Sequence, residues 1–243
     1  MNAYHGEAKD GSVWSLGRLI RELAEIDGLE RLRYTTSHPL DMDDELISAH
    51  GEVPQLMPYL HLPIQSGSNH VLAAMNRRHT SDVYLAVIDK LRAVRPDIAM
   101  SGDFIVGFPG ETDGDFAETL QLVNQVGYAS AYSFKYSPRP GTPAATIEHQ
   151  LPEHVKAERL ESLQQLLNAQ QFAFNNATEG QIVDVLVERS GGRTGQMAGR
   201  SPYMQAVNFA GGQLQIGQIV SCKLSAARQN SMSGEIIAIK GAA

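Results

Sequence analysis

Residues 101–111 read SGDFIVGFPGE, and this stretch decides the fold class. Its apolar run, Phe104-Ile105-Val106, ends in the turn Gly107-Phe108-Pro109-Gly110. A short apolar run bounded by glycine and proline is typical of a buried strand. One acid, Asp103, precedes the run and another, Glu111, follows the turn. We ask which structure needs a stiff strand that ends in such a turn between two carboxylates.

Strand and helix patterns alternate on both sides of this stretch. Such alternation predicts an α/β fold with a parallel sheet and right-handed crossovers. The loops after the four expected strands read SHP, IQSGS, GFPGE and SPRPGTP, and one shared site explains them better than four ordinary turns. The expected strands are 32–36, 59–64, 104–106 and 131–136, and the expected helices are 12–27 with Ser12 as N-cap, 43–51, 81–94, 113–126 and 152–175.

The pattern changes after the long helix 152–175. Short apolar stretches at 182–188, 204–209, 219–224 and 234–239 alternate with Gly-rich turns. Evenly spaced short strands of this kind predict a small antiparallel β-barrel. We therefore expect two domains, 1–175 and 176–241.

The composition suits a folded protein in a reducing compartment. Of 243 residues, 42% are hydrophobic and 19% are charged, and the apolar runs are too short for a membrane span. The start of the chain has no signal-peptide pattern, and a single cysteine, Cys222, excludes an internal disulfide. These features predict a cytoplasmic location without membrane association.

The net charge of −7 is distributed unevenly. Residues 1–177 carry 14 basic and 23 acidic side chains, whereas residues 178–243 carry 6 and 4. A mildly basic tail on an acidic body hints at a polyanionic partner for the tail.

Two groups of side chains could carry chemistry. His38, His61 and Asp103 lie on or near successive expected strands and could bind the metal of a barrel hydrolase. Gln65, Arg77 and Asp103 could instead meet a ligand with hydroxyls and a carboxylate, unless they are an ordinary surface arginine and polar residues at the core edge. The sequence contains none of the common phosphate-binding glycine loops.

Several long motifs together resemble the tRNA methylthiotransferases. They are HLPIQSGSNHVLAAMNRRHT, DFIVGFPGET, YSFKYSPRPGTPAA, GQMAGRSPYMQAVNF and NSMSGEII, and they cover nearly the whole chain. Members of that family are radical S-adenosylmethionine (radical SAM) enzymes with an RNA-binding barrel called TRAM. The resemblance implies a partial radical-SAM-type parallel β/α barrel, with four of its six strand–helix units, followed by TRAM.

The resemblance also implies roles for individual residues. Gln65 and Asp103 would contact the ribose of S-adenosylmethionine, and Arg77 its methionine carboxylate. Gly107 would let the backbone approach the adenosine, on a segment that lines the cofactor site as far as Glu111. The residues expected to contact RNA are Arg139 in the proline loop and Arg193, Arg200, Tyr203 and Lys223 in the tail.

One family feature is absent. The family binds its radical [4Fe-4S] cluster through C-x-x-x-C-x-x-C, whereas Cys222 lies in a tail strand and is expected to fill the core. The resemblance thus implies a C-terminal piece that is inactive alone and belongs with a missing N-terminal part. The parent activity would add a methylthio group to C2 of N6-isopentenyladenosine near the anticodon, with the anticodon stem-loop of tRNA as partner. A metal-dependent hydrolase and a non-catalytic RNA-binding protein remain alternatives.

Overall fold

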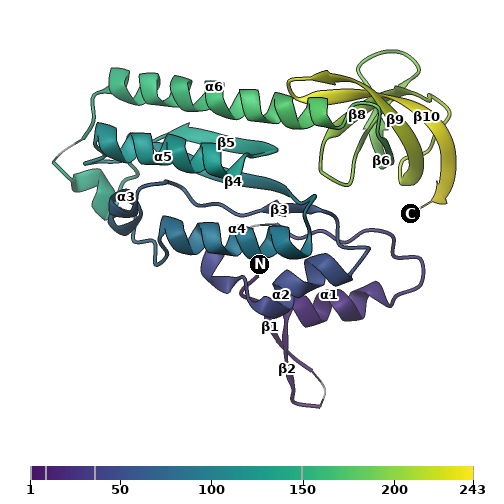
Figure 1. Cartoon of the computed structure of the whole chain (residues 1–243), viewed down its shortest axis with the longest axis horizontal. Helices are drawn as coiled ribbons and strands as arrows, with labels where there is room; N and C mark the ends of the chain where they lie inside the picture. Colours follow the sequence, from purple (N-terminus) through teal and green to yellow (C-terminus); the bar gives the residue numbers. More distant parts are fainter. Residues whose placement is uncertain (1, 9, 36, 149, 243) are drawn as a thin grey trace.

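The computed structural model describes residues 2–8, 10–35, 37–148 and 150–242 and shows an α/β body beside a closed β-barrel (Figure 1). No helix in this part of the chain is both long and apolar enough to cross a bilayer. The body contains β1 (His5–Glu7), β2 (Val13–Ser15), α1 (Leu16–Ala24), α2 (Asp44–Glu52), β3 (Tyr59–His61), α3 (Asn69–Ala74), α4 (Ser81–Val94), β4 (Ala99–Val106), α5 (Asp113–Val126), β5 (Ser130–Lys135) and α6 (Glu153–Ala177). The barrel contains β6 (Ile182–Ser190), β7 (Gln196–Arg200), β8 (Ala206–Ala210), β9 (Gln218–Arg228) and β10 (Ser231–Ala242).

The strand of the opening motif lies at the centre of a parallel sheet with the order β3-β4-β5. Beyond β3 the chain stays hydrogen-bonded to β4, because the Gln65 amide donates to the Asp103 carbonyl (2.9 Å) and the Ile105 amide donates to the Gln65 carbonyl (2.8 Å). This arrangement confirms the predicted α/β class with a partial parallel sheet.

The expected strand at 32–36 is wrong for the described residues 32–35. Leu32 makes only an isolated parallel bridge with Leu56, and residue 36 lies outside the described residues. The next strand, β3, has only three residues in regular pairing, so it offers little edge for a neighbour. The described sheet accordingly has three strands where the sequence suggested four.

The first helix begins later than the sequence suggested. Val13–Ser15 pairs with His5–Glu7 as a hairpin, so Ser15 rather than Ser12 is the N-cap, and its hydroxyl accepts the Arg18 amide at 3.1 Å. The helical spacing of apolar residues extends into β2, but Val13 is 65% exposed because the hairpin side is open. Local spacing therefore overestimated the length of α1 (Leu16–Ala24).

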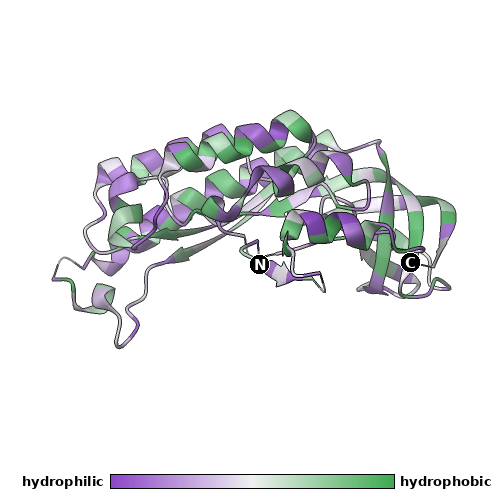
Figure 2. Ribbon diagram, turned by 90° about the horizontal axis from the view of Figure 1, so that it is seen from below, coloured by the Kyte–Doolittle hydropathy of each residue, from purple (hydrophilic) through white to green (hydrophobic). Residues whose placement is uncertain are grey.

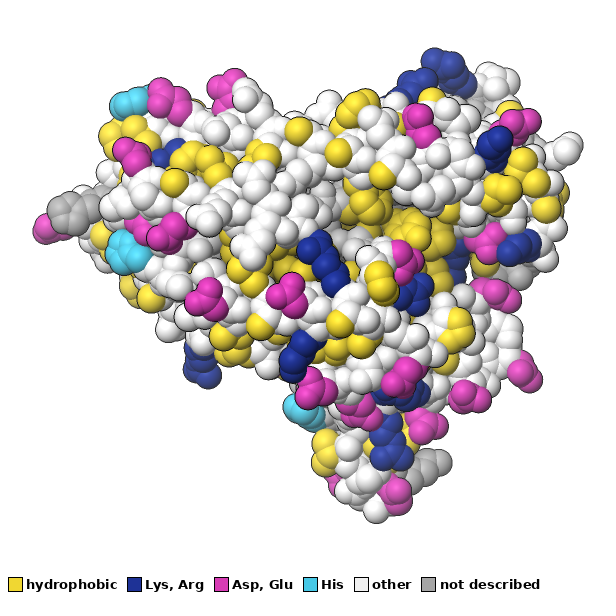
Figure 3. Space-filling model, in the orientation of Figure 1, with side chains coloured by type: hydrophobic (Ala, Val, Ile, Leu, Met, Phe, Trp, Pro, Cys, Tyr) yellow, Lys and Arg dark blue, Asp and Glu magenta, His cyan; other side chains and the backbone are white. Residues whose placement is uncertain are grey.

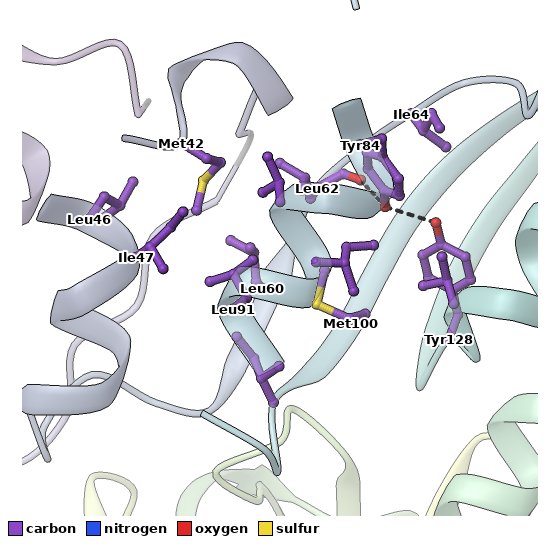
Figure 4. Packing of buried hydrophobic residues seen from close by; sticks show 14 of the residues in the cluster. Met42, Leu46, Ile47, Leu60, Leu62, Ile64, Tyr84, Leu91, Met100 and Tyr128 are labelled. Carbon is purple, nitrogen blue, oxygen red and sulfur yellow. Dashed lines mark hydrogen bonds between the residues drawn. The ribbon is translucent and has the colours of Figure 1, made fainter. Parts of the chain in front are cut away.

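A pair of buried tyrosines joins the core of the body to the sheet (Figure 4). The Tyr84 hydroxyl donates to the Leu62 carbonyl at 2.9 Å and lies 2.8 Å from the Tyr128 hydroxyl. Burial raises the pKa of both phenols, so both stay protonated and their hydroxyls are satisfied.

The helices that cover the sheet alternate apolar and polar segments, as Figure 2 shows.

The tail forms a closed barrel with the strand order β10-β8-β7-β6-β9 around its own apolar core. Cys222 is fully buried in that core, as predicted, and burial raises the pKa of its thiol to about 11. Two details differ from the prediction. β7 was not anticipated, and β10 pairs with β8 in parallel.

The sequence pattern of β7 does not predict a strand, because its centre consists of the small residues Ala198 and Gly199. A Cβ at Gly199 would lie 2.1 Å from the Leu186 carbonyl oxygen, so this position must be glycine for β6 and β7 to pair. Glycine and alanine have low strand propensity, and the pairing therefore overrides the local preference.

One face of the sheet carries exposed aromatic residues. Asp103 pairs with Tyr132 and Ile105 pairs with Phe134, so these four side chains share the face opposite the buried Phe104. Tyr132 is 61% exposed and Phe134 is 55% exposed. Large apolar groups in this position favour association with another surface.

We predict that replacing both aromatic residues, Tyr132→Ser with Phe134→Ser, lowers self-association of the chain. Each Å² of apolar surface that association removes from water contributes about 25 cal/mol. Sedimentation velocity over a range of concentrations measures the effect, and Val83→Ser with Val94→Ser, each 40% exposed on α4, is the matched control. An equal change in the two double variants, or no change in either, would contradict the prediction.

Candidate active site at the carboxyl edge of the sheet

Gln65 occupies a strained position at the carboxyl end of the β3 segment. Its φ is +83°, a left-handed conformation that is uncommon for a residue with a side chain. The two backbone hydrogen bonds to β4 hold it there, and the residue is only 8% exposed. Strain of this kind costs on the order of 1 kcal/mol and persists at sites where geometry serves a ligand.

Asp103, on β4, is a neighbour of Gln65, and a histidine lies beside its carboxylate. His61 Nε2 lies 3.6 Å from Asp103 Oδ2, and His61 Nδ1 lies 3.1 Å from Ser101 Oγ. The imidazole also packs edge-on against Tyr132, with ring centroids 6.3 Å apart. The Asp103 side chain remains 28% exposed, so its carboxylate can still accept hydrogen bonds from a ligand.

Gly107 is required by the packing of α6. Its φ is +72°, and a Cβ there would lie 2.5 Å from Cγ of Lys156. Its amide donates to Glu111 Oε1 at 3.0 Å, which closes the turn. This contact gives the glycine a structural reason besides the predicted approach to adenosine, which stays a prediction.

Glu111 forms a buried ion pair with the helix above the sheet. Arg159 Nη1 of α6 lies 2.6 Å from Glu111 Oε1, and Nη2 lies 2.7 Å from Asp113 Oδ1. Burial raises the pKa of Glu111, while the hydrogen bonds from Gly107 and Arg159 oppose that shift. In the described structure the Glu111 side chain contacts Gly107 and Arg159 of the same chain. Its predicted contact with the cofactor stays a prediction.

The loop after β3 is bound to the start of α5. The Ser68 hydroxyl donates to Asp115, and the Gly67 amide donates to Thr119 Oγ1 at 3.0 Å. Burial alone would raise the pKa of Asp115, but hydrogen bonds from Ser68 and Thr112 outweigh it and hold this pKa well below its usual range. The two loops therefore form one connected edge. These contacts join residues far apart in the chain, so no local pattern predicts them.

The structure does not join the other two predicted body residues to Asp103. Arg77 is half-buried after α3, where its amide donates to the Leu72 carbonyl (2.9 Å). Arg139 is exposed in the loop beyond β5, where its carbonyl accepts the Thr142 amide (3.2 Å). Their predicted roles stay predictions.

The alternative metal site of His38, His61 and Asp103 is not formed in the described part of the chain. The His38 ring packs edge-on against His79 with centroids 5.2 Å apart, whereas His61 lies with Asp103. His38 instead caps a short turn, accepting the Leu40 amide on Nδ1 at 3.3 Å. Across the described ranges no three His, Cys, Asp or Glu side chains are arranged to bind a metal.

The tail residues predicted to bind RNA fall into two groups. Arg193 and Lys223 are exposed on the barrel. Arg200 contacts Glu188 (3.5 Å), and the Tyr203 hydroxyl donates to Asp97 in the body at 3.0 Å. The aromatic ring of Phe209 is not free to stack on a base, because this residue is 2% exposed in the barrel core.

Arginines of the body bind the barrel at the amino edge of the sheet, which is opposite the candidate site. Arg31 donates to the Asp184 carbonyl (2.7 Å) and the Arg200 carbonyl (3.1 Å), and Arg33 donates to the Ser201 carbonyl (2.8 Å). Figure 3 shows hydrophobic side chains gathered in the hollow between the body and the barrel. Beside these arginines lies a cleft of about 900 Å³.

Comparison with known proteins agrees with this two-part architecture. Residues 10–123 match the Radical SAM superfamily, and residues 176–237 match the TRAM domain. The body thus has a radical SAM-type α/β fold with a partial parallel sheet, and the closed barrel is consistent with TRAM. Taken together, the matches support an enzyme of the radical SAM type.

A solved structure offers a further comparison. It is coproporphyrinogen III oxidase (HemN) from Escherichia coli, described as a radical SAM enzyme, with 15% sequence identity and a TM-score of 0.47. The alignment covers 76% of this chain and 45% of the other, so the chain spans less than half the length of that protein.

Radical SAM proteins use S-adenosylmethionine and an iron–sulfur cluster, and the chain fits these two groups unequally. Asp103 offers a partly exposed carboxylate to a hydroxyl-bearing ligand, and the largely buried Gln65 is hydrogen-bonded to the Asp103 carbonyl through its backbone amide. The sequence holds one cysteine, Cys222, and its side chain is fully buried in the barrel. A cluster usually takes three or four thiolates, so the residues of this chain do not fit it.

We predict that Arg159→Met destabilises the body by about 3–5 kcal/mol, because it leaves the Glu111 carboxylate buried without its cationic partner. Urea denaturation measures the loss, and Arg18→Met, which breaks an exposed pair with Glu22, is the control and should cost under about 1 kcal/mol. Adding Glu111→Gln to Arg159→Met should restore most of the stability. Equal losses for the two single variants would refute the assigned role of the buried pair.

Proposed function

We propose that this chain is the cofactor-binding and RNA-binding part of a radical SAM tRNA methylthiotransferase of the MiaB type. The reaction adds a methylthio group to C2 of N6-isopentenyladenosine near the anticodon. The observation that carries the proposal is the strained Gln65 at the carboxyl edge, whose backbone amide is hydrogen-bonded to the Asp103 carbonyl, in a chain that matches both radical SAM and TRAM. The site of action is the reducing cytoplasm.

The residues of this chain bind and orient the cofactor. Gln65 and Asp103 would hold the ribose hydroxyls, Arg77 would hold the methionine carboxylate, and Gly107 would let the backbone approach the adenosine. S-adenosylmethionine, when bound, supplies the methyl group and the radical chemistry. Since the chain offers no cluster ligands, we expect no turnover from it alone, and the missing N-terminal part of the enzyme is the partner that completes it.

A non-catalytic RNA-binding protein is the second candidate. The TRAM match favours it, and so does the single buried cysteine. The two candidates differ in their binding of S-adenosylmethionine, because RNA binding alone does not require a cofactor site at Gln65 and Asp103.

We predict weak binding of S-adenosylmethionine that depends on Asp103. Asp103→Asn removes a charged hydrogen-bond acceptor worth about 1.5–3 kcal/mol, so the affinity should fall at least about tenfold. Isothermal calorimetry measures it, with Asp89→Asn, an exposed carboxylate on α4, as the control. If the two variants bind equally, Asp103 is not a ligand. If the unaltered chain binds no S-adenosylmethionine, the second candidate is favoured.

We predict salt-dependent binding of RNA through the tail. Arg193→Ala with Lys223→Ala should weaken binding of a tRNA anticodon stem-loop and lower the salt slope by about two, because each phosphate contact contributes about one. Titrations at about 50 and about 200 mM salt measure the slope. The control removes the same charge from the body by Arg18→Ala with Lys90→Ala. Binding that ignores salt, or an equal effect of the two pairs, counts against the RNA role of the tail.

A further inference from the structure

Helix α6 connects the two ends of the molecule. Its first turns lie at the carboxyl edge, where Lys156 packs on Gly107 and Arg159 pairs with Glu111. Its last turn enters the barrel, where Asn175 Nδ2 donates to the Arg228 carbonyl at 3.0 Å and Asn175 Oδ1 accepts from Gln205 at 3.0 Å. Figure 1 shows the helix lying along the outside of the body and ending against the barrel.

The second half of α6 has an exposed face without charge. No Asp, Glu, Lys or Arg occurs from 162 to 177, although the first 177 residues carry 23 acidic side chains. At 100° per residue, five exposed side chains of this half share one side of the helix. They are Gln164, Gln165, Asn168, Phe172 and Asn176, and we call them the amide face.

The chemistry of the amide face suits a nucleic acid. Glutamine and asparagine can both donate to phosphate oxygens and hydrogen-bond sugars and bases. Phe172 is 43% exposed, so a base could stack on its ring. The acidic side chains of the body repel an approaching phosphate chain. The amide face carries no negative charge and therefore adds no repulsion.

The amide face is continuous with the barrel. Asn175 donates to the carbonyls of Arg228 and Gln229, which belong to the exposed turn Arg228-Gln229-Asn230. The last turn of a helix carries a partial negative charge. Arg228 is an exposed cationic residue whose carbonyl accepts from Asn175 in this last turn. Twelve residue steps from Gln164 to Asn176 span about 18 Å, which is the length of roughly five nucleotides.

The other surface between the body and the barrel is unfavourable for phosphates. The cleft is lined by four carboxylates against two cations, Arg31 and Lys240, so acidic groups prevail in it. The carboxylates are those of Glu25, Asp27, Glu30 and Asp184. The exposed Glu158 and Glu161 mark where the amide face ends on the carboxyl-edge side. Charge therefore favours α6 as the path along which a polyanion leaves the barrel.

We propose that the amide face of α6 is an RNA-binding surface that extends the barrel's contact toward the carboxyl edge. The inference rests on the proposed function for its partner, a structured RNA that also contacts the barrel. The RNA backbone lies along Gln164, Asn168 and Asn176, and one base stacks on Phe172.

The test converts amides into the acids of nearly identical shape. Gln164→Glu with Asn168→Asp should weaken binding of an RNA stem-loop to the full chain about tenfold at low salt, and the loss should shrink at high salt. The matched control, Gln121→Glu with Gln125→Glu, adds the same two charges at the same spacing on exposed α5 positions and should change affinity less than about twofold. Fluorescence anisotropy measures affinity, and thermal melting checks the fold.

A variant that is expected to bind RNA more tightly makes the test independent of folding defects, because a misfolded protein would bind RNA less tightly. Gln164→Lys with Asn168→Lys should tighten binding several-fold, and Phe172→Ala should weaken it more than Val94→Ala does on α4. Equal losses in the two acidic pairs, or unchanged affinity in all α6 variants, would overturn the inference while leaving RNA binding by the barrel intact. If the unaltered chain binds no RNA stem-loop, both this surface and the RNA part of the proposed function are wrong.

Discussion

The buried pair between Arg159 and Glu111 is the contact on which the arrangement of the molecule depends. It joins the turn after the central strand to a helix that is 48 residues further along the chain. Arg159 is 7% exposed and Glu111 is 5% exposed, so the pair is largely shielded from solvent. Such a pair stabilises little by itself, but losing one partner is costly because the other charge stays buried. The turn and α6 are therefore held in one relative position.

That position determines where the barrel lies. α6 runs from the carboxyl edge to the barrel, and the arginines at the amino edge give the barrel a second attachment through Arg31 and Arg33. A module held at two separate places cannot rotate freely about its linker. The candidate cofactor site and the barrel thus lie at opposite edges of the sheet at a fixed separation. An RNA that uses both must extend along the surface between them.

The sequence predicted those parts of the fold that depend on local pattern. The run FIVGFPGE has both the apolar core and the turn residues of a strand at the carboxyl edge, and β4 lies there. The neighbouring positions of Gln65 and Asp103 follow from the same logic, because parallel strands bring their carboxyl ends together, whereas their cofactor contacts stay predictions. The strand predicted at 32–36 does not form over the described residues 32–35. A strand needs a neighbouring strand to pair with, and β3 has only three residues in regular pairing. Arg159 and Asp115 were missed because each acts through a residue more than forty positions away.

The open face of the sheet explains why we expect ligand binding at Asp103 to be weak. Asp103 is 28% exposed at its side chain, and its neighbour Tyr132 is 61% exposed. A hydrogen bond to a carboxylate in contact with water competes with solvent, and its net contribution is smaller than in a dry site. Exclusion of water by a covering surface would strengthen each polar contact and bury the aromatic rings in the same step. The exposed aromatics and the weakly shielded acid are therefore two consequences of one uncovered face.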